Sequence, residues 1–264
     1  MIRHCLMALC SIFVATQGVS TPQHGRSSAD TLTLSPTMLA TSFIQPQRTV
    51  YKAYVLPCAN DPRGEPRYFG VFIERTQLVK RGDSTFIRQI TRSPLLSGGY
   101  AFDTAMFVQH SLIPVLLRGH AGSLSIAMNF WNDSVTWEAK QGNVVEDVGR
   151  APMPRGAMAV VGDRLLVRSL KDLGKLTGKV VRVNFIDMPG MGTGAIFEGY
   201  LAVSSTDSVP LPHEGIRSGW AVAVGSGSDK VYFLDPHTRQ ILGWERAENE
   251  GICPLRYLEL GIDR

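Results

Sequence analysis

The sequence predicts a mainly β protein: a curved antiparallel sheet, half-barrel-like, made of two β lobes joined by one crossover helix. Three observations predict this fold. Short runs rich in β-branched and aromatic residues recur, turn residues separate them at close spacing, and one mid-chain segment has a helical period. Antiparallel pairing is the economical arrangement, because a hairpin needs only a short loop.

Composition supports a globular chain and gives no sign of a nucleic-acid partner. The 264 residues suffice for one ordinary domain or two small ones. An apolar fraction of 44% excludes global disorder, and 26 glycines with 15 prolines exclude a coiled coil. The formal net charge is +4 without a basic stripe, so the charge does not predict nucleic-acid binding.

The first twenty residues have the layout of a secretory signal peptide. Arg3 precedes an apolar run, CLMALCSIFVA at residues 5–15, which is too short to cross ~30 Å of hydrocarbon as a helix. Gly18 and Ser20 supply small residues before a cleavage site. We therefore expect residues 1–20 to be a signal peptide and the mature chain to be periplasmic or extracellular, with no membrane span. A buried N-terminal strand or helix is the alternative.

The expected export determines how the cysteines are interpreted. Removal of the signal peptide leaves Cys58 and Cys253. In an oxidising compartment a lone pair predicts one disulfide, which would link the start of the folded chain to its end. Two unpaired buried thiols are the alternative. A catalytic thiol is disfavoured, because no histidine is near either cysteine in sequence.

The rest of the chain divides by composition. Residues 21–47 are rich in Ser, Thr, Pro and Gln and predict a flexible leader, with order beginning near Thr49. Residues 48–264 should form the β-rich domain, with possible lobes at 48–150 and 155–264. Strands are expected in each lobe, at residues 68–73, 76–79, 85–91, 107–108, 115–117, 124–130, 135–137, 180–186, 195–203, 220–224, 231–234 and 241–244.

One helix is expected between the two lobes. Met158, Val161 and Leu165 recur at helical spacing after a pair of prolines, which predicts a helix at about 157–172. A weak internal repeat flanks it: residues 107–115 read much like residues 233–242 when one gap is allowed. Two lobes of similar design would explain the repeat, and so would the general similarity of hairpins.

The later of these hairpins carries a family resemblance. Residues 232–242, YFLDPHTRQIL, resemble the strand, Asp-Pro-x-Thr-Arg, strand hairpin of an uncharacterised family of exported, periplasmic β-sheet proteins. Those proteins are similar in layout to bacterial lipoprotein-carrier folds. Residues 107–117 resemble the family's earlier hairpin and residues 164–173 its mid-chain helix. The resemblance implies a curved sheet around an apolar cavity and no established catalytic residues.

Motifs that carry chemistry are weak. Residues 190–195, GMGTGA, match a dinucleotide-binding spacing, but the following sequence is β-like where that fingerprint needs a helix. Residues 81–83, RGD, are typical of a hairpin turn. No two histidines have metal-ligand spacing, and Glu74 belongs to alternating charges that indicate solvated strand edges. We therefore predict neither a cofactor nor a metal.

The expected function is non-enzymatic binding. Most strand aromatics must be core, and inward positions of a curved sheet would line an apolar pocket. The candidate lining residues are Phe72, Phe130, Trp137, Phe185, Phe197, Tyr200, Trp220 and Trp244. The chain would hold a lipid-like ligand or bind a cell-envelope partner. A secreted hydrolase with a loop-built site around His213 and His237, and a structural scaffold, are the alternatives.

Overall fold

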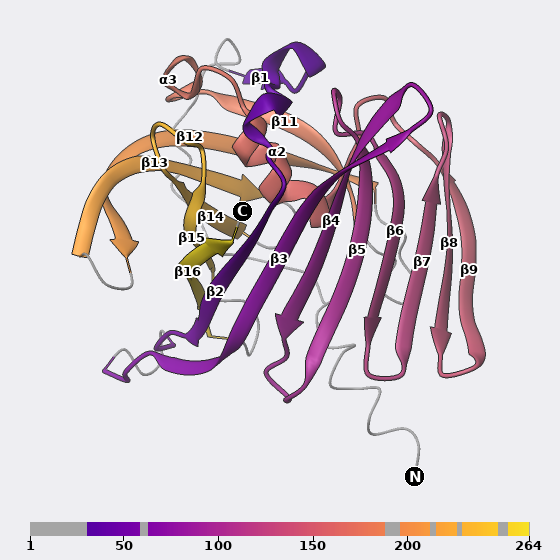
Figure 1. Cartoon of the computed structure of the whole chain (residues 1–264), viewed down its shortest axis with the longest axis horizontal. Coiled ribbons are helices and arrows are strands. Elements are labelled where there is room, and N and C mark those ends of the chain that lie inside the picture. The colour runs from indigo at the N-terminus through magenta and orange to yellow at the C-terminus, as the bar shows by residue number, and fades with distance from the viewer. Residues whose placement is uncertain are drawn as a thin grey trace.

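One large curved β-sheet dominates the molecule (Figure 1). The computed structural model describes residues 31–58, 63–187, 196–211, 215–225, 229–247 and 253–263, so the expected signal peptide at 1–20 lies outside the described residues. Sixteen strands of the described chain belong to this sheet. The predicted mainly β, curved and largely antiparallel fold is confirmed.

The sheet consists of two meanders of consecutive strands. The first contains β2 (Gln47–Val55), β3 (Arg67–Arg81), β4 (Ser84–Pro94), β5 (Tyr100–Val108), β6 (Pro114–Ala121), β7 (Leu124–Phe130), β8 (Ser134–Gln141) and β9 (Val144–Pro152). The second contains β11 (Val180–Ile186), β12 (Ile196–Leu211), β13 (Gly215–Gly225), β14 (Asp229–Leu234), β15 (Ile241–Arg246) and β16 (Leu255–Asp263). Two short strands, β1 (Thr31–Thr33) and β10 (Met158–Ala159), pair in parallel with β11.

The two meanders join at one seam, where β16 pairs antiparallel with β2. The two expected lobes are therefore halves of a single sheet. The predicted disulfide between Cys58 and Cys253 is present at one end of the seam, with a Cα–Cα distance of 4.7 Å. Beside it, the Leu56 N–H donates to the carbonyl oxygen of Pro254 at 2.8 Å. Strands from opposite ends of the chain are thus paired and covalently linked.

The internal repeat is visible in the geometry of two hairpins. In the β5–β6 turn, the Val108 N–H donates to Ile113 O at 2.9 Å and Leu112 has a φ of 56°. In the β14–β15 turn, Asp235 N–H donates to Gln240 O at 2.8 Å and Arg239 has a φ of 61°. Each turn follows a register shift at the same position of its hairpin. The two meanders therefore share a turn design as well as a strand order.

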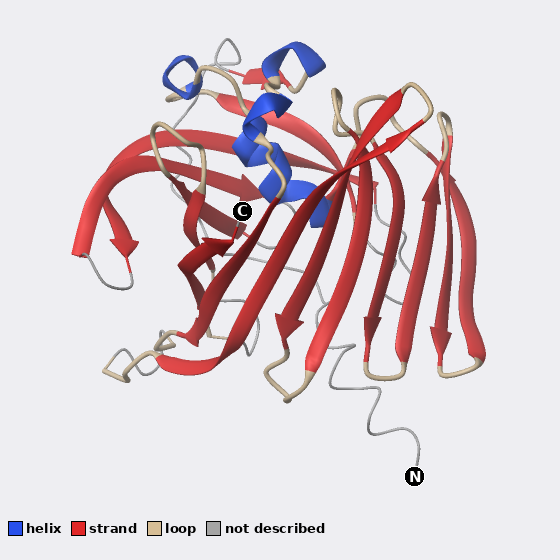
Figure 2. Cartoon of the chain, viewed as in Figure 1, coloured by secondary structure: helices blue, strands red, loops and turns tan. Residues whose placement is uncertain are grey.

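The chain crosses between the meanders through short helices. After β10 come the 3-10 turn η4 (Val160–Gly162), the helix α2 (Asp163–Ser169) and the helix α3 (Leu173–Leu176). The expected single helix at 157–172 is correct only for α2, because β10 extends along β11 and Leu170 leaves the helical region with ψ at 126°. Every residue of α2 is buried, and Figure 2 shows this helix inside the curve of the sheet. None of the helices in the described ranges is long and apolar enough to cross a membrane.

The segment before β2 covers α2. It carries the 3-10 turns η2 (Pro36–Met38) and η3 (Thr41–Phe43), and it buries Leu39 and Ile44 in the core. The Ala40 N–H donates to Ser169 O at 2.6 Å. Residues 31–47 therefore do not form the flexible leader that their composition predicts, because their few apolar side chains pack on the helix.

The last strand of the first meander, β9, is an open edge of the sheet. Its pairing with β8 has a register shift at Ala139/Lys140, which indicates a β-bulge. On the inner side Asp147 accepts a hydrogen bond from the Trp137 indole at 2.9 Å, whereas Val148 is 66% exposed. A bulge and an inward carboxylate are devices that discourage further strand addition.

Replacement of both Cys58 and Cys253 by Ser should lower the free energy of unfolding by about 2–5 kcal/mol, since the bridge closes a loop of 195 residues. Urea unfolding followed by tryptophan fluorescence measures the change. Either single Ser variant should match the double variant, because each removes the same bridge. An unchanged unfolding midpoint would contradict a stabilising role.

Candidate functional site

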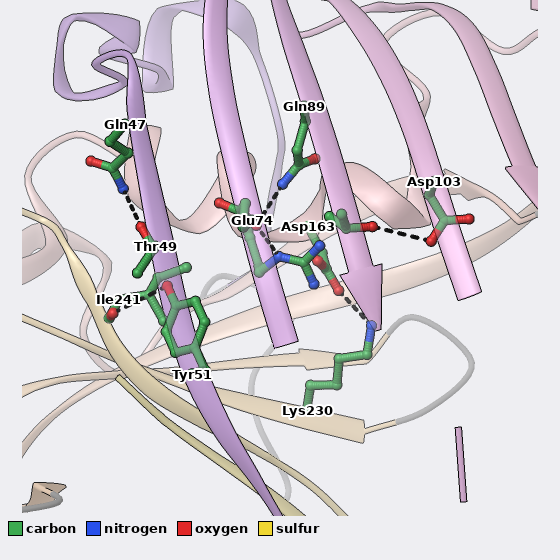
Figure 3. Close-up of polar contacts among 11 residues, drawn as sticks. Gln47, Thr49, Tyr51, Glu74, Gln89, Asp103, Asp163, Lys230 and Ile241 are labelled. Atoms are coloured by element: carbon green, nitrogen blue, oxygen red, sulfur yellow. Dashed lines mark hydrogen bonds and ion pairs between the residues drawn. The ribbon is translucent and has the colours of Figure 1, made fainter. Parts of the chain in front are cut away.

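A network of buried charges occupies the inside of the sheet (Figure 3). The Asp163 carboxylate at the start of α2 pairs with Lys230 of β14, Nζ to Oδ2, at 2.6 Å. The next residue, Arg164, pairs with Glu74 of β3, Nε to Oε2, at 2.5 Å. Asp163, Arg164 and Glu74 are at most 8% exposed. One helical turn is thereby joined to both meanders.

The backbone explains why two adjacent residues reach opposite halves. Successive side chains of an α-helix point about 100° apart, so Asp163 and Arg164 diverge. The helix also approaches the sheet closely at Gly162, where an added Cβ would lie 2.7 Å from the Phe107 ring. A side chain at position 162 would push α2 away from β5, and this shift would move Asp163 and Arg164 away from Lys230 and Glu74.

Glu74 belongs to a polar row across the inner face of β3, β4 and β5. The Gln89 side-chain amide donates to Glu74 Oε2 at 2.8 Å. In register with Glu74, Thr91 donates through its hydroxyl to Asp103 Oδ2 at 3.2 Å. The interpretation of Glu74 as a solvated strand residue is therefore wrong. Glu74 is two residues from buried Phe72 and two from buried Thr76, so all three side chains lie on the inner face.

The electrostatic environment favours the charged forms of Asp163 and Arg164. Burial alone would raise the pKa of Asp163, but Lys230 and Arg164 outweigh it and hold that pKa below its ordinary value. Burial alone would lower the pKa of Arg164, but Glu74 and Asp163 raise it above its ordinary value. For Asp103 burial dominates and raises the pKa, although its hydrogen bond from Thr91 acts in the opposite direction.

Aromatic rings line one side of Arg164. The guanidinium carbon lies 4.8 Å from the Phe72 ring centre and 5.5 Å from that of Trp244, which is cation–π geometry. Trp244 in turn stacks on Tyr257 with ring centres 4.4 Å apart and meets Tyr51 edge-on at 4.6 Å. These rings fill the space between α2 and the seam, so this part of the interior is packed.

The eight aromatics predicted to line a pocket lie in several places. Phe72, Phe130, Phe185 and Trp244 are buried members of the core. Three others, Trp137, Phe197 and Trp220, are partly buried and pack against that core. Tyr200 is 41% exposed and faces outward over β13. Phe72 and Trp244 contact each other, as do Phe185 and Phe197, and ligand contact by any of the eight stays a prediction.

A depression of about 440 Å³ lies on the face of β12–β14 that points away from the core. Its position follows from strand alternation: Leu201, Val222 and Val224 point inward and are buried, so their neighbours point outward. We call this feature the outer groove, and it is bordered by Thr177, Gly178, Lys179, Ala202, Val203, Ser204, Ala221, Ala223 and Val231. The sequence signal was only a run of small residues, which does not by itself distinguish a groove from a sheet surface.

The remaining motifs have structural roles or lie outside the described residues. His213 and the GMGTGA segment at 190–195 are outside them. His237 lies in the β14–β15 turn, where its backbone N–H donates to Asp235 Oδ1 at 2.9 Å. Gly82 of the RGD segment has a φ of 58° between β3 and β4, as the predicted hairpin turn requires. Within the described ranges no cluster of three His, Cys, Asp or Glu residues could hold a metal.

Substitution of Arg164 by Met should destabilise the protein by about 3–5 kcal/mol, because it leaves the Glu74 carboxylate buried without its cation. Chemical denaturation measures this loss. The matched control is Arg182→Met, which breaks the exposed pair with Glu198 at 3.7 Å and should cost at most about 1 kcal/mol. Equal losses of unfolding free energy for the two substitutions would show that the buried pair matters no more to stability than the exposed one.

The Asp163 pair should make stability depend on pH. Its folded pKa is depressed, so the pair stabilises the fold above the unfolded pKa of about 4 and loses that effect as pH falls further. Asp163→Asn should therefore be less stable than wild type at pH 7, with a difference that shrinks at pH 3. Thermal unfolding at both pH values tests this, with Asp172→Asn, which loses the exposed pair to Lys175, as control. A constant difference would exclude titration of Asp163.

Comparison with known proteins supports the fold. No protein-family model and no curated protein sequence matches the chain. A crystal structure of a β-barrel-like protein of the domain of unknown function DUF1849, from Brucella abortus, is similar with a TM-score of 0.50. It is 8% identical in sequence, and the match covers 83% of this chain and 97% of that chain. The chain is therefore similar to a β-barrel-like domain over most of its length.

Proposed function

We propose that the chain is an exported, non-enzymatic binding module that takes a lipid-like ligand in the outer groove. The observation that carries this proposal is the groove itself, a depression of about 440 Å³ on β12–β14. Ligand pockets of proteins are concave, mostly apolar and roughly 300–1,000 Å³ in volume. The groove meets these criteria on a sheet whose opposite face is already packed.

The lining favours an alkyl chain over a polar ligand. Ala202, Ala221, Ala223 and Val231 present methyl groups from three neighbouring strands. These small side chains leave room for the alkyl chain of a ligand to lie along the strands and contact their backbone. Burial of apolar ligand surface in such a groove contributes roughly 25 cal/mol per Å² removed from water. Lys179 adds a polar border at one side of the groove.

The arrangement inside the sheet supports binding more than catalysis. Glu74 and Asp163 are each engaged by a cation, and Glu74 also accepts from Gln89. A general base or nucleophile needs a group that can exchange its proton with a substrate, which these saturated carboxylates do not offer. The disulfide at the seam supports export, because such bonds persist in oxidising compartments.

The test is retention and binding of lipid by the purified chain. Native mass spectrometry before and after delipidation should show bound lipid, and a fluorescent fatty acid should rebind. Ala223→Trp fills the groove and should weaken binding about tenfold or more. Ala127→Trp is the matched control, because it adds the same ring to a half-buried position on β7.

Two results would reject the proposal. One is a wild-type chain that neither retains nor rebinds any lipid. The other is equal affinity for the Ala223→Trp and wild-type chains, which would remove the outer groove as the site. Thermal unfolding of both Trp variants establishes that each is folded before its affinity is compared.

A further inference from the structure

The outer face of β3–β6 carries positive charge without matching acids. Glu74 and Asp103 are the only acidic residues within the bounds of these four strands, and both belong to the polar row on the inner face. Outward positions of the same strands hold basic residues instead. We call this surface the cationic face, and it consists of Arg75, Arg88, Arg92, Arg118 and His120.

Strand register gathers these side chains into one patch. Arg75 and Arg118 lie in the same row across the sheet, since the register connects them through one residue each of β4 and β5. In the next row, Arg92 pairs with Phe102 and Phe102 pairs with His120. Neighbouring strands lie about 4.8 Å apart, and residues two apart along a strand lie about 7 Å apart, so the face is roughly 15 Å across.

The charges of this face are oriented by neutral groups. Arg118 donates to two backbone carbonyl oxygens and to the Asn129 side chain, each at 3.0 Å. Arg92 lies over Tyr100, with its guanidinium carbon 3.6 Å from the ring centre. In the described part of the chain, no carboxylate forms an ion pair with any arginine of the face. The positive charge is therefore available to an anionic partner.

The strands beside the face do not cancel its charge. On one side β2 adds the cation Lys52, which is in register with Val71 of β3. On the other side β7 contains no charged residue, and Glu138 of β8 pairs with Lys140 at 2.6 Å. The excess of positive charge thus extends over several neighbouring strands.

Exposed apolar side chains lie at one end of the cationic face. Phe102 is 38% exposed and stacks on His120 with ring centres 4.9 Å apart. Leu96, in the turn between β4 and β5, is 50% exposed, and Figure 1 shows this turn at the lower edge of the sheet. Cations beside exposed aromatic and aliphatic groups are typical of surfaces that bind the membrane interface. A soluble polyanion would use the charges but would leave Leu96 without a role.

We propose that the cationic face binds the surface of a bilayer that contains anionic phospholipid. The arginines contact lipid phosphates, while Phe102 and Leu96 enter the headgroup region. Each arginine near such a surface strengthens binding about fivefold, so the effect is shared among several side chains. The face is separate from the outer groove, and the proposal does not depend on lipid binding there.

Co-sedimentation of the full chain with vesicles tests this proposal. Vesicles of phosphatidylcholine are compared with vesicles in which about one third of the lipid is phosphatidylglycerol, in about 0.1 M sodium chloride. Wild type should bind the anionic vesicles about tenfold or more tightly, and about 0.5 M salt should remove the difference by screening. The apolar run at residues 5–15 is present in every sample, so the comparison between the two vesicle types cancels its contribution.

Two charge variants locate the binding surface. Arg75→Gln combined with Arg88→Gln should weaken binding to the anionic vesicles about tenfold or more. Lys171→Gln combined with Lys175→Gln is the matched control, because it removes two positive charges from exposed positions outside the face. The control should bind almost as tightly as wild type. Thermal unfolding establishes that both variants are folded.

A second pair of variants separates a bilayer from a soluble polyanion. Leu96→Ser should weaken vesicle binding severalfold, because it removes an apolar side chain from the headgroup region. Ile113→Ser, which changes an exposed residue in the turn at the other end of β5, should bind as wild type does.

Three results would overturn the proposal. The first is equal binding of wild type to the two vesicle types, which requires no variant. The second is wild type that binds dextran sulfate but not the anionic vesicles, which would assign the face to a soluble polyanion. The third is a folded Arg75→Gln, Arg88→Gln chain that binds the anionic vesicles as tightly as wild type.

Discussion

The ion pairs that α2 makes with both halves of the sheet determine how the interior is organised. Arg164 is joined to β3 and Asp163 to β14, so a helix of seven residues connects strands that are far apart in the sheet. Buried ion pairs add little net stability compared with apolar packing, because desolvation offsets their attraction. Their geometry, however, fixes the placement of α2, since a shift of the helix toward either meander would separate one of the two ion pairs and leave a buried charge without its partner.

The surrounding structure is arranged around that placement. Aromatic rings of β3, β15 and β16 pack beside Arg164, and the segment before β2 covers the other end of the helix. Around Arg164 the interior of the described sheet is thus packed with side chains. The lipid-like ligand that we propose would lie on the outside, where small residues of β12–β14 leave the outer groove.

Strands in which apolar and polar residues alternate clearly could be predicted from the sequence, and strands without that alternation could not. The predicted strands at 124–130 and 180–186 coincide with β7 and β11. No strand was predicted at β9, because an edge strand with polar residues lacks the alternation of a half-buried one. Glu74 was misread since a lone acid among arginines usually faces water, and only its phase with Phe72 indicated the inner face. Long-range pairs such as Asp163 with Lys230 leave no local pattern.

The seam between β2 and β16 has a consequence for the timing of assembly. Its partners run from Arg48 with Asp263 to Val55 with Leu255, so a strand made at the end of the second meander completes the pairing of the first long one. Each meander can collapse from local hairpins, but their union waits for the synthesis of β16. Until β16 is made, β2 lacks this neighbour and the nascent chain cannot close the sheet.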